Sequence, residues 1–154
     1  MGLQIDTFSW DSLFAALGGN DAQRAERKMV QTASRRLYKE TESNIKTKFP
    51  NAANTNPNYS DRVIDGLRMY VMKNDEAAAQ AVVHIMGTRA KQSQTYKLRF
   101  YENGTNDRYT TSGAYRGRIK PLSFFGDAVS TVEPQVTQIM QGELNKFIDK
   151  LNGN

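Results

Sequence analysis

The side chains with the clearest capacity for binding lie in a polar stretch at residues 103–120. Tyrosines and cations are interleaved there with glycines, and the set is Arg108, Tyr109, Tyr115, Arg116, Arg118 and Lys120. Cations bind phosphate or carboxylate groups, while tyrosine rings stack on nucleic-acid bases or fill pockets in a partner protein. The stretch therefore favours a contact between protein subunits, with DNA contact as the second interpretation and an exposed loop without a binding role as the third.

Two other side chains are candidates for catalysis, His84 and Glu102. His84 is the single histidine and stands in an apolar run, so we expect a packed or edge-facing strand residue rather than a general base. Glu102 precedes a glycine turn, and no second carboxylate accompanies it at a defined spacing. We expect Glu102 to accept hydrogen bonds from nearby loop amides.

Motifs of the common enzyme classes are missing. The chain has no phosphate-binding loop of the Walker type, no GxGxxG, no HExxH and no GxSxG. One histidine and no cysteine leave too few ligands for a zinc site. We therefore expect no catalytic residues, no cofactor and no metal. Arg/Tyr/Lys sets also occur in metal-independent ribonucleases of the toxin type, so a small basic nucleic-acid-binding protein or such a ribonuclease is the alternative.

The charge of the chain is positive and unevenly distributed. Its 154 residues include 21 Lys and Arg and 16 Asp and Glu, a net charge of +5. Residues 21–49 hold eight basic and four acidic side chains, and residues 87–120 hold eight and two. Such segments favour contact with a polyanion or an acidic partner, or are ordinary solvated faces. No apolar run is long enough to span a membrane, and residues 1–20 lack the Lys or Arg of a secretory signal.

Helical periodicity predicts three helical segments. Trp10, Leu13, Phe14 and Leu17 form one stripe, which places a short helix within residues 1–19. A long helix is expected over residues 20–49, where small and medium apolar residues recur every three or four positions until Pro50 ends it. A C-terminal helix is expected within residues 121–152, opening near Phe124, with a kink or a fresh start at Pro134.

Strands are expected over residues 66–102. Alternation predicts them at 67–71, 78–86 and 96–101, with short connections that suggest an antiparallel meander. Asn103-Gly104 ends the last strand in a turn, and residues 103–120 follow as a long extended arm. The sequence thus predicts one α+β domain over residues 1–154, in which a small antiparallel sheet of three to four strands packs against the long helix and the C-terminal helix.

The residues that flank the arm carry a resemblance to a known family. The strand end FYENGT (100–105) and the helix opening IKPLSFF (119–125), followed by Ala128, resemble the pattern of the head–tail connector, or tail-completion (neck), proteins of long-tailed bacteriophages. The positions that match are Glu102, Gly104, Thr105, Pro121, Phe124 and Phe125. The resemblance implies that these six residues have architectural roles.

The resemblance also implies a function. It suggests a structural virion protein that is assembled in the host cytoplasm and forms a ring at the head–tail junction, between the portal or adaptor and the tail-tube proteins. A hexamer is favoured and a dodecamer is left open. Passing DNA would contact the lumen without sequence readout. The sheet edge and the arm would supply one face of the ring interface, and the long helix from Asp21 would supply the other.

Overall fold

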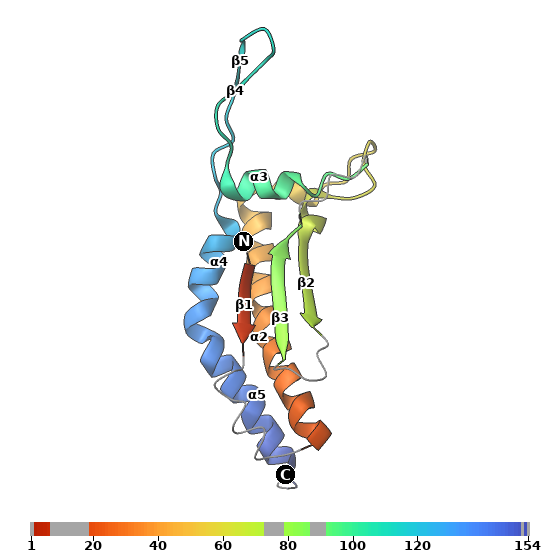
Figure 1. Ribbon diagram of the computed structural model, residues 1–154, viewed down its shortest axis with the longest axis vertical. Helices are drawn as coiled ribbons and strands as arrows, with labels where there is room; N and C mark the ends of the chain where they lie inside the picture. The colour runs from red at the N-terminus through yellow and green to blue at the C-terminus, as the bar shows by residue number, and fades with distance from the viewer. Residues whose placement is uncertain (1, 7–18, 73–78, 87–91, 152, 154) are drawn as a thin grey trace. The chain divides into compact units, whose positions relative to one another are not determined.

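The computed structural model describes residues 2–6, 19–72, 79–86, 92–151 and 153 (Figure 1). The fold is α+β and contains the predicted long N-terminal helix and the C-terminal helix. The elements in chain order are β1 (Gly2–Asp6), α2 (Gly19–Lys48), η2 (Pro50–Ala53), η3 (Val63–Gly66), β2 (Leu67–Met72), β3 (Gln80–Ile85), α3 (Lys97–Asn103), β4 (Arg108–Tyr109), β5 (Tyr115–Gly117), α4 (Phe124–Val132), η4 (Glu133–Gln135) and α5 (Val136–Leu151).

The chain forms two compact units, the first built from three segments of the sequence and the second from two. The first unit comprises residues 1–39, 69–84 and 130–154, and the second comprises residues 40–68 and 85–129 with the arm. Within the described residues, no helix is long and apolar enough to cross a membrane.

In the first unit, α2 packs against α5 through small side chains. Ala22, Ala25, Met29 and Ala33 of α2 are buried together with Met140 and Leu144 of α5. Their spacing along α2 places them on one stripe of the helix, and alanines let the neighbouring backbone approach closely. This is the narrow seam that the sequence predicts for the long helix. α2 ends at Lys48, and Pro50, two residues further on, opens η2, as expected of a residue that cannot continue a helix.

The main sheet packs on a second stripe of the same helix. Its strand order is β1-β3-β2, and β1 pairs antiparallel with β3 in a register that sets Leu3 opposite Val83. Val30 of α2 is buried against Ala79 and Ala81, with Val71 of β2 beside them. Alternate residues of β3 are buried, which is the pattern of a strand with one face on a core.

The composition of this sheet corrects the prediction in two places. The predicted strand at residues 96–101 is wrong, because residues 97–103 form α3. The strand on the other side of β3 is instead β1, which falls in the region predicted as a short N-terminal helix. The stripe from Trp10 to Leu17 that carried that helix prediction lies outside the described residues.

In the second unit, α3 is anchored on both faces. Leu98 and Glu102 are buried one helical turn apart. On another face, the ring of Tyr101 lies 4.0 Å from that of Phe49, centroid to centroid. Gly66 lies under α3, since a Cβ there would come within 2.8 Å of the carbonyl oxygen of Thr95. The start of α3 is therefore fixed against η3.

The C-terminal helix is interrupted where the proline predicts it. α4 ends at Val132, η4 carries Pro134, and α5 begins at Val136. The tighter η4 turn accommodates a residue that lacks an amide donor. The predicted kink or fresh start at Pro134 is thus found as the short η4 turn between two helices.

Candidate functional site

The arm at residues 103–120, predicted as an extended loop, is a β-hairpin that projects away from α3 (Figure 1). Residues 110–114 join β4 and β5, and the chain reverses within them at residues 111–113. The amide of Thr110 donates to the carbonyl oxygen of Ala114 at 2.8 Å, and the amide of Gly113 donates to that of Thr110 at 2.9 Å. Gly113 has a φ of +83°, as this turn class requires at its last position.

A bulge re-aims the returning strand. Arg108 pairs with Gly117 and Tyr109 with Tyr115, which leaves Arg116 as the extra residue between two paired positions. Gly117 has a φ of +77°, and its carbonyl oxygen accepts a hydrogen bond from Nε of Arg108 at 3.3 Å. Gly113 and Gly117 therefore hold defined turn and bulge conformations.

The two tyrosines form the aromatic part of the arm. Tyr109 and Tyr115 are 61% and 59% exposed, and their ring centroids lie 5.5 Å apart. The hydroxyl of Tyr115 donates to Asp107 at 3.1 Å, which restrains the ring without covering it. Such rigid, exposed aromatic area is typical of binding hot spots.

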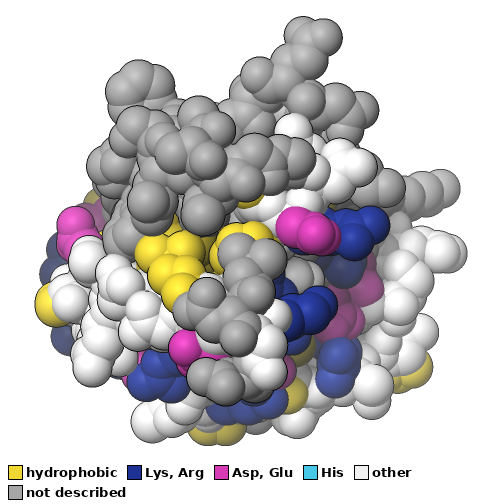
Figure 2. Space-filling view, turned by 90° about the horizontal axis from the view of Figure 1, so that it is seen from below, with side chains coloured by type: hydrophobic (Ala, Val, Ile, Leu, Met, Phe, Trp, Pro, Cys, Tyr) yellow, Lys and Arg dark blue, Asp and Glu magenta, His cyan; other side chains and the backbone are white. Residues whose placement is uncertain are grey.

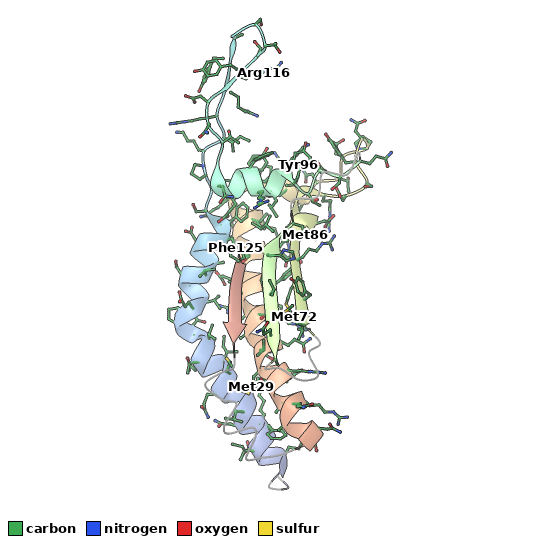
Figure 3. All side chains as sticks on the ribbon, viewed as in Figure 1. Met29, Met72, Met86, Tyr96, Arg116 and Phe125 are labelled. Carbon is green, nitrogen blue, oxygen red and sulfur yellow. The ribbon has the colours of Figure 1, made fainter. Side chains whose placement is uncertain are left out.

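The cations of the returning strand remain available. Arg116 projects from the arm (Figure 3), and Arg116, Arg118 and Lys120 are all exposed. No hydrogen bond or ion pair joins these three side chains to any described residue, whereas Arg108 is held by the bulge. The arm therefore presents three uncompensated positive charges and two aromatic rings.

The root of the arm is tightly built around Gly104. This residue has a φ of +71°, and a Cβ there would lie 2.8 Å from the carbonyl oxygen of Ile119 and 2.9 Å from Pro121. Thr105 connects the two legs of the arm through its backbone amide and its side-chain hydroxyl. Its amide donates to the carbonyl oxygen of Ile119 and its Oγ1 accepts from the amide of Ile119, both at 2.9 Å.

Glu102 joins the root to the first turn of α4. Its carboxylate is 5% exposed and accepts from the amides of Phe125 at 2.9 Å and Gly126 at 3.1 Å. Phe124 and Phe125 are buried at this point, at 0% and 1% exposure. The prediction that Glu102 accepts hydrogen bonds from nearby amides is confirmed, and the donors belong to the start of a helix, where a negative charge is favoured.

Two residues of α2, Asn44 and Lys48, also hold the root of the arm and the start of α4, and the sequence did not predict these contacts. Nζ of Lys48 donates to the carbonyl oxygen of Leu122 at 2.8 Å and pairs with Asp127. Nδ2 of Asn44 donates to the carbonyl oxygen of Phe124 at 3.1 Å. Lys48 looked like one more cation of a basic helix flank, because nothing local in the sequence links it to residues more than 70 positions away.

The remaining candidate, His84, lies in β3 as a half-buried strand residue of the first unit. Its ring packs edge-on against Tyr70 of β2, with centroids 5.3 Å apart. This is the packed strand position that the sequence favoured for it over a general base.

Comparison with protein-family models, with curated proteins and with solved structures finds no match to this chain. The site is therefore interpreted from its own geometry. A hairpin whose root is held by hydrogen bonds and whose rings and cations are exposed can bind the surface of a partner molecule.

Proposed function

We propose that this chain is a ring-forming structural subunit at the head–tail junction of a tailed bacteriophage. The subunit completes the tail or seals the neck between the portal or adaptor and the tail-tube proteins of the virion. A hexamer is favoured over a dodecamer. The proposal assigns no catalytic step and no cofactor to the chain.

The observation that carries the proposal is the contrast between the two ends of the arm. At the root, Gly104, Thr105 and Glu102 are packed or hydrogen-bonded, whereas no residue from 103 to 123 is buried in the chain's own core. A two-stranded hairpin alone is marginally stable in water, and exposed tyrosines add nothing to the fold. A partner surface that covers them supplies the missing burial.

A closed ring requires two different faces on each subunit. The arm is one face, and we assign the other to the exposed side of α2, which carries the cations Lys28, Arg35 and Lys39. Both faces are basic, so acidic groups of the portal, the tail tube or a bound polyanion must balance the charge of the assembly. This requirement makes ring formation dependent on salt concentration.

The test is to remove the tip of the arm and keep its root. Deletion of Asp107–Arg116 joins Asn106 to Gly117, a pair suited to a tight turn, and leaves Thr105 and Ile119 in place. We expect an unchanged melting temperature and the loss of rings in mass photometry and electron micrographs of the purified protein. The matched control is Arg99→Ala, which removes an exposed cation from α3. Normal assembly of the deletion variant would contradict the role of the arm.

Contact with nucleic acid is the second candidate, favoured by the interleaved rings and cations of the arm. A toxin-like ribonuclease is the version of this candidate in which the bound nucleic acid is also cleaved. Cleavage of RNA by the purified protein, abolished by His84→Ala or Arg116→Ala, would establish that version. Absence of cleavage together with a gene position beside portal and tail genes would favour the connector.

A further inference from the structure

The root of the arm contains a hollow that the proposed ring contact leaves unused. It has a volume of about 630 Å³. Its lining consists of Asn103, Gly104, Thr105, Asn106, Arg118, Ile119, Lys120 and Pro121. Two of these residues are cations, two have carboxamide side chains, and none is acidic. The hollow is therefore electropositive and rich in hydrogen-bond donors.

The geometry of the root fixes the backbone that carries these donors. The bonds between Thr105 and Ile119 at 2.9 Å and the close approach of Gly104 to Pro121 hold the two legs of the arm together. Arg118 and Lys120 are two residues apart on one leg, and both line the same hollow. A site whose backbone is already ordered loses less entropy when a ligand binds.

A second hollow, in the first unit, is less suitable for binding an anion because acidic side chains also line it. It lies between the start of α2 and the end of α5, has a volume of about 470 Å³, and is lined by cations around Phe147. Figure 2 shows apolar side chains there between basic and acidic ones. Asp21 pairs with Arg24 at 3.4 Å and Glu143 with Lys146 at 2.7 Å. Two of the four cations that line this hollow are therefore already in ion pairs with carboxylates of the chain.

We propose that the hollow at the root of the arm binds a phosphate group of a nucleic-acid strand. The guanidinium of Arg118 offers a planar fork, and Lys120 offers an ammonium group, which are the two side chains that proteins use for phosphate. The side chains of Asn103 and Asn106 add neutral donors. The two non-bridging oxygens of a backbone phosphate accept from the guanidinium fork and from the ammonium group at the same time.

The tyrosines indicate why the phosphate belongs to a polymer. Tyr109 and Tyr115 stand on the same arm with their rings exposed, and such rings stack on unpaired bases without selecting a sequence. Phosphate contact at the root and stacking along the arm together form one binding site for a single strand. This site shares the two tyrosines with the proposed contact between subunits and adds the root cations Arg118 and Lys120.

The experiment measures the fluorescence anisotropy of a labelled oligothymidylate of about 16 nucleotides, the upper end of common site sizes. The variant is Arg118→Ala/Lys120→Ala. We expect roughly tenfold weaker binding, and a plot of log affinity against log salt that is shallower by about 0.7, since the two cations hold one phosphate. Arg68→Ala/Arg99→Ala removes the same charge from exposed positions outside the arm and outside the exposed side of α2. Equal losses in the two double variants would overturn the proposal.

Three further measurements separate the sources of the bound anion. Tyr109→Ala/Tyr115→Ala should weaken oligonucleotide binding while leaving competition by inorganic phosphate unchanged. If the tyrosine variant binds the oligonucleotide normally and phosphate displaces it, the site holds free phosphate, and the polymer part of the proposal is wrong. If a polyglutamate peptide of equal charge competes as well as the oligonucleotide does, the hollow takes acidic protein instead and the phosphate assignment fails.

The deletion of Asp107–Arg116 separates this inference from the ring proposal, because it keeps all eight lining residues. The deletion variant should still bind inorganic phosphate while it no longer forms rings. Loss of phosphate binding in a variant whose circular dichroism is unchanged would count against the site at the root, whatever the state of assembly.

Discussion

Replacing Glu102 by alanine tests the most connected point of the second unit. The carboxylate is buried and accepts two amide hydrogen bonds, from Phe125 at 2.9 Å and Gly126 at 3.1 Å. The amide of Phe125 is buried, so loss of its acceptor costs about 1–3 kcal/mol, and the half-buried amide of Gly126 adds about 1 kcal/mol. Removal of a negative charge from the start of α4 adds about 0.3–1 kcal/mol.

Together these contributions give about 3 kcal/mol, which for a chain of this length lowers Tm by about 6–12 °C. Differential scanning calorimetry measures the shift, and amide hydrogen exchange should show the largest loss of protection over residues 121–132. Glu133→Ala removes the same side chain from an exposed position after α4 and should change stability by less than about 0.5 kcal/mol. If the two variants melt within a degree of each other, Glu102 does not hold the root of the arm.

Three smaller perturbations examine other positions. Ser34 is buried at 1% exposure and its hydroxyl has no hydrogen-bond partner among the described residues, so Ser34→Ala should raise the free energy of unfolding by about 1 kcal/mol in urea titrations; a decrease would reveal a partner for the hydroxyl. Gly104→Ala places a Cβ within 2.8 Å of the carbonyl oxygen of Ile119 at a φ of +71°, so we expect a loss of about 1–3 kcal/mol in the same titration, and an unchanged midpoint would show that the root relaxes freely. Hydrogen bonds from the Arg62 side chain lower the pKa of Asp65 below its ordinary value of 3.8, so this carboxylate stabilises the fold above that pH and the contribution is lost as the pH falls through the lowered pKa. Asp65→Asn should therefore flatten the acid limb of a urea midpoint series run from about pH 5 to about pH 2, and an equally steep limb would assign the acid sensitivity to other groups.

The helices could be predicted because their patterns are long. The seam of α2 extends over most of its 30 residues, and Pro50 and Pro134 mark helix boundaries by a mechanism that needs no tertiary information. The segment at residues 96–103 is too short for this. Tyr96, Leu98 and Phe100 recur at every second position as one face of a strand would, but the same residues also fit a helix. That helix buries Leu98 and leaves Phe100 at 36% exposure.

The pairing of β1 with β3 could not be predicted from the sequence either. β1 lies far from β3 in the chain, and long-range pairing leaves little trace in a single sequence. The hairpin of the arm was open to prediction, since Thr-Thr-Ser-Gly is suitable for a three-residue turn and Gly117 for a bulge. β4 and β5 are too short to show an alternating pattern, so the polar composition of residues 103–120 favoured a loop.

The residues that resemble the neck proteins meet at one place in the structure, and this limits what the resemblance can imply. Glu102, Gly104, Thr105 and Pro121 close the root of the arm, and the two phenylalanines bury the start of α4. Such residues explain how an arm is fastened, and any protein with an arm at this junction needs them. What the arm grips depends instead on Tyr109, Tyr115 and the cations, whose exposure leaves them free to differ. Assembly must therefore be tested at the tip of the arm and phosphate binding at its root, because each can fail while the other holds.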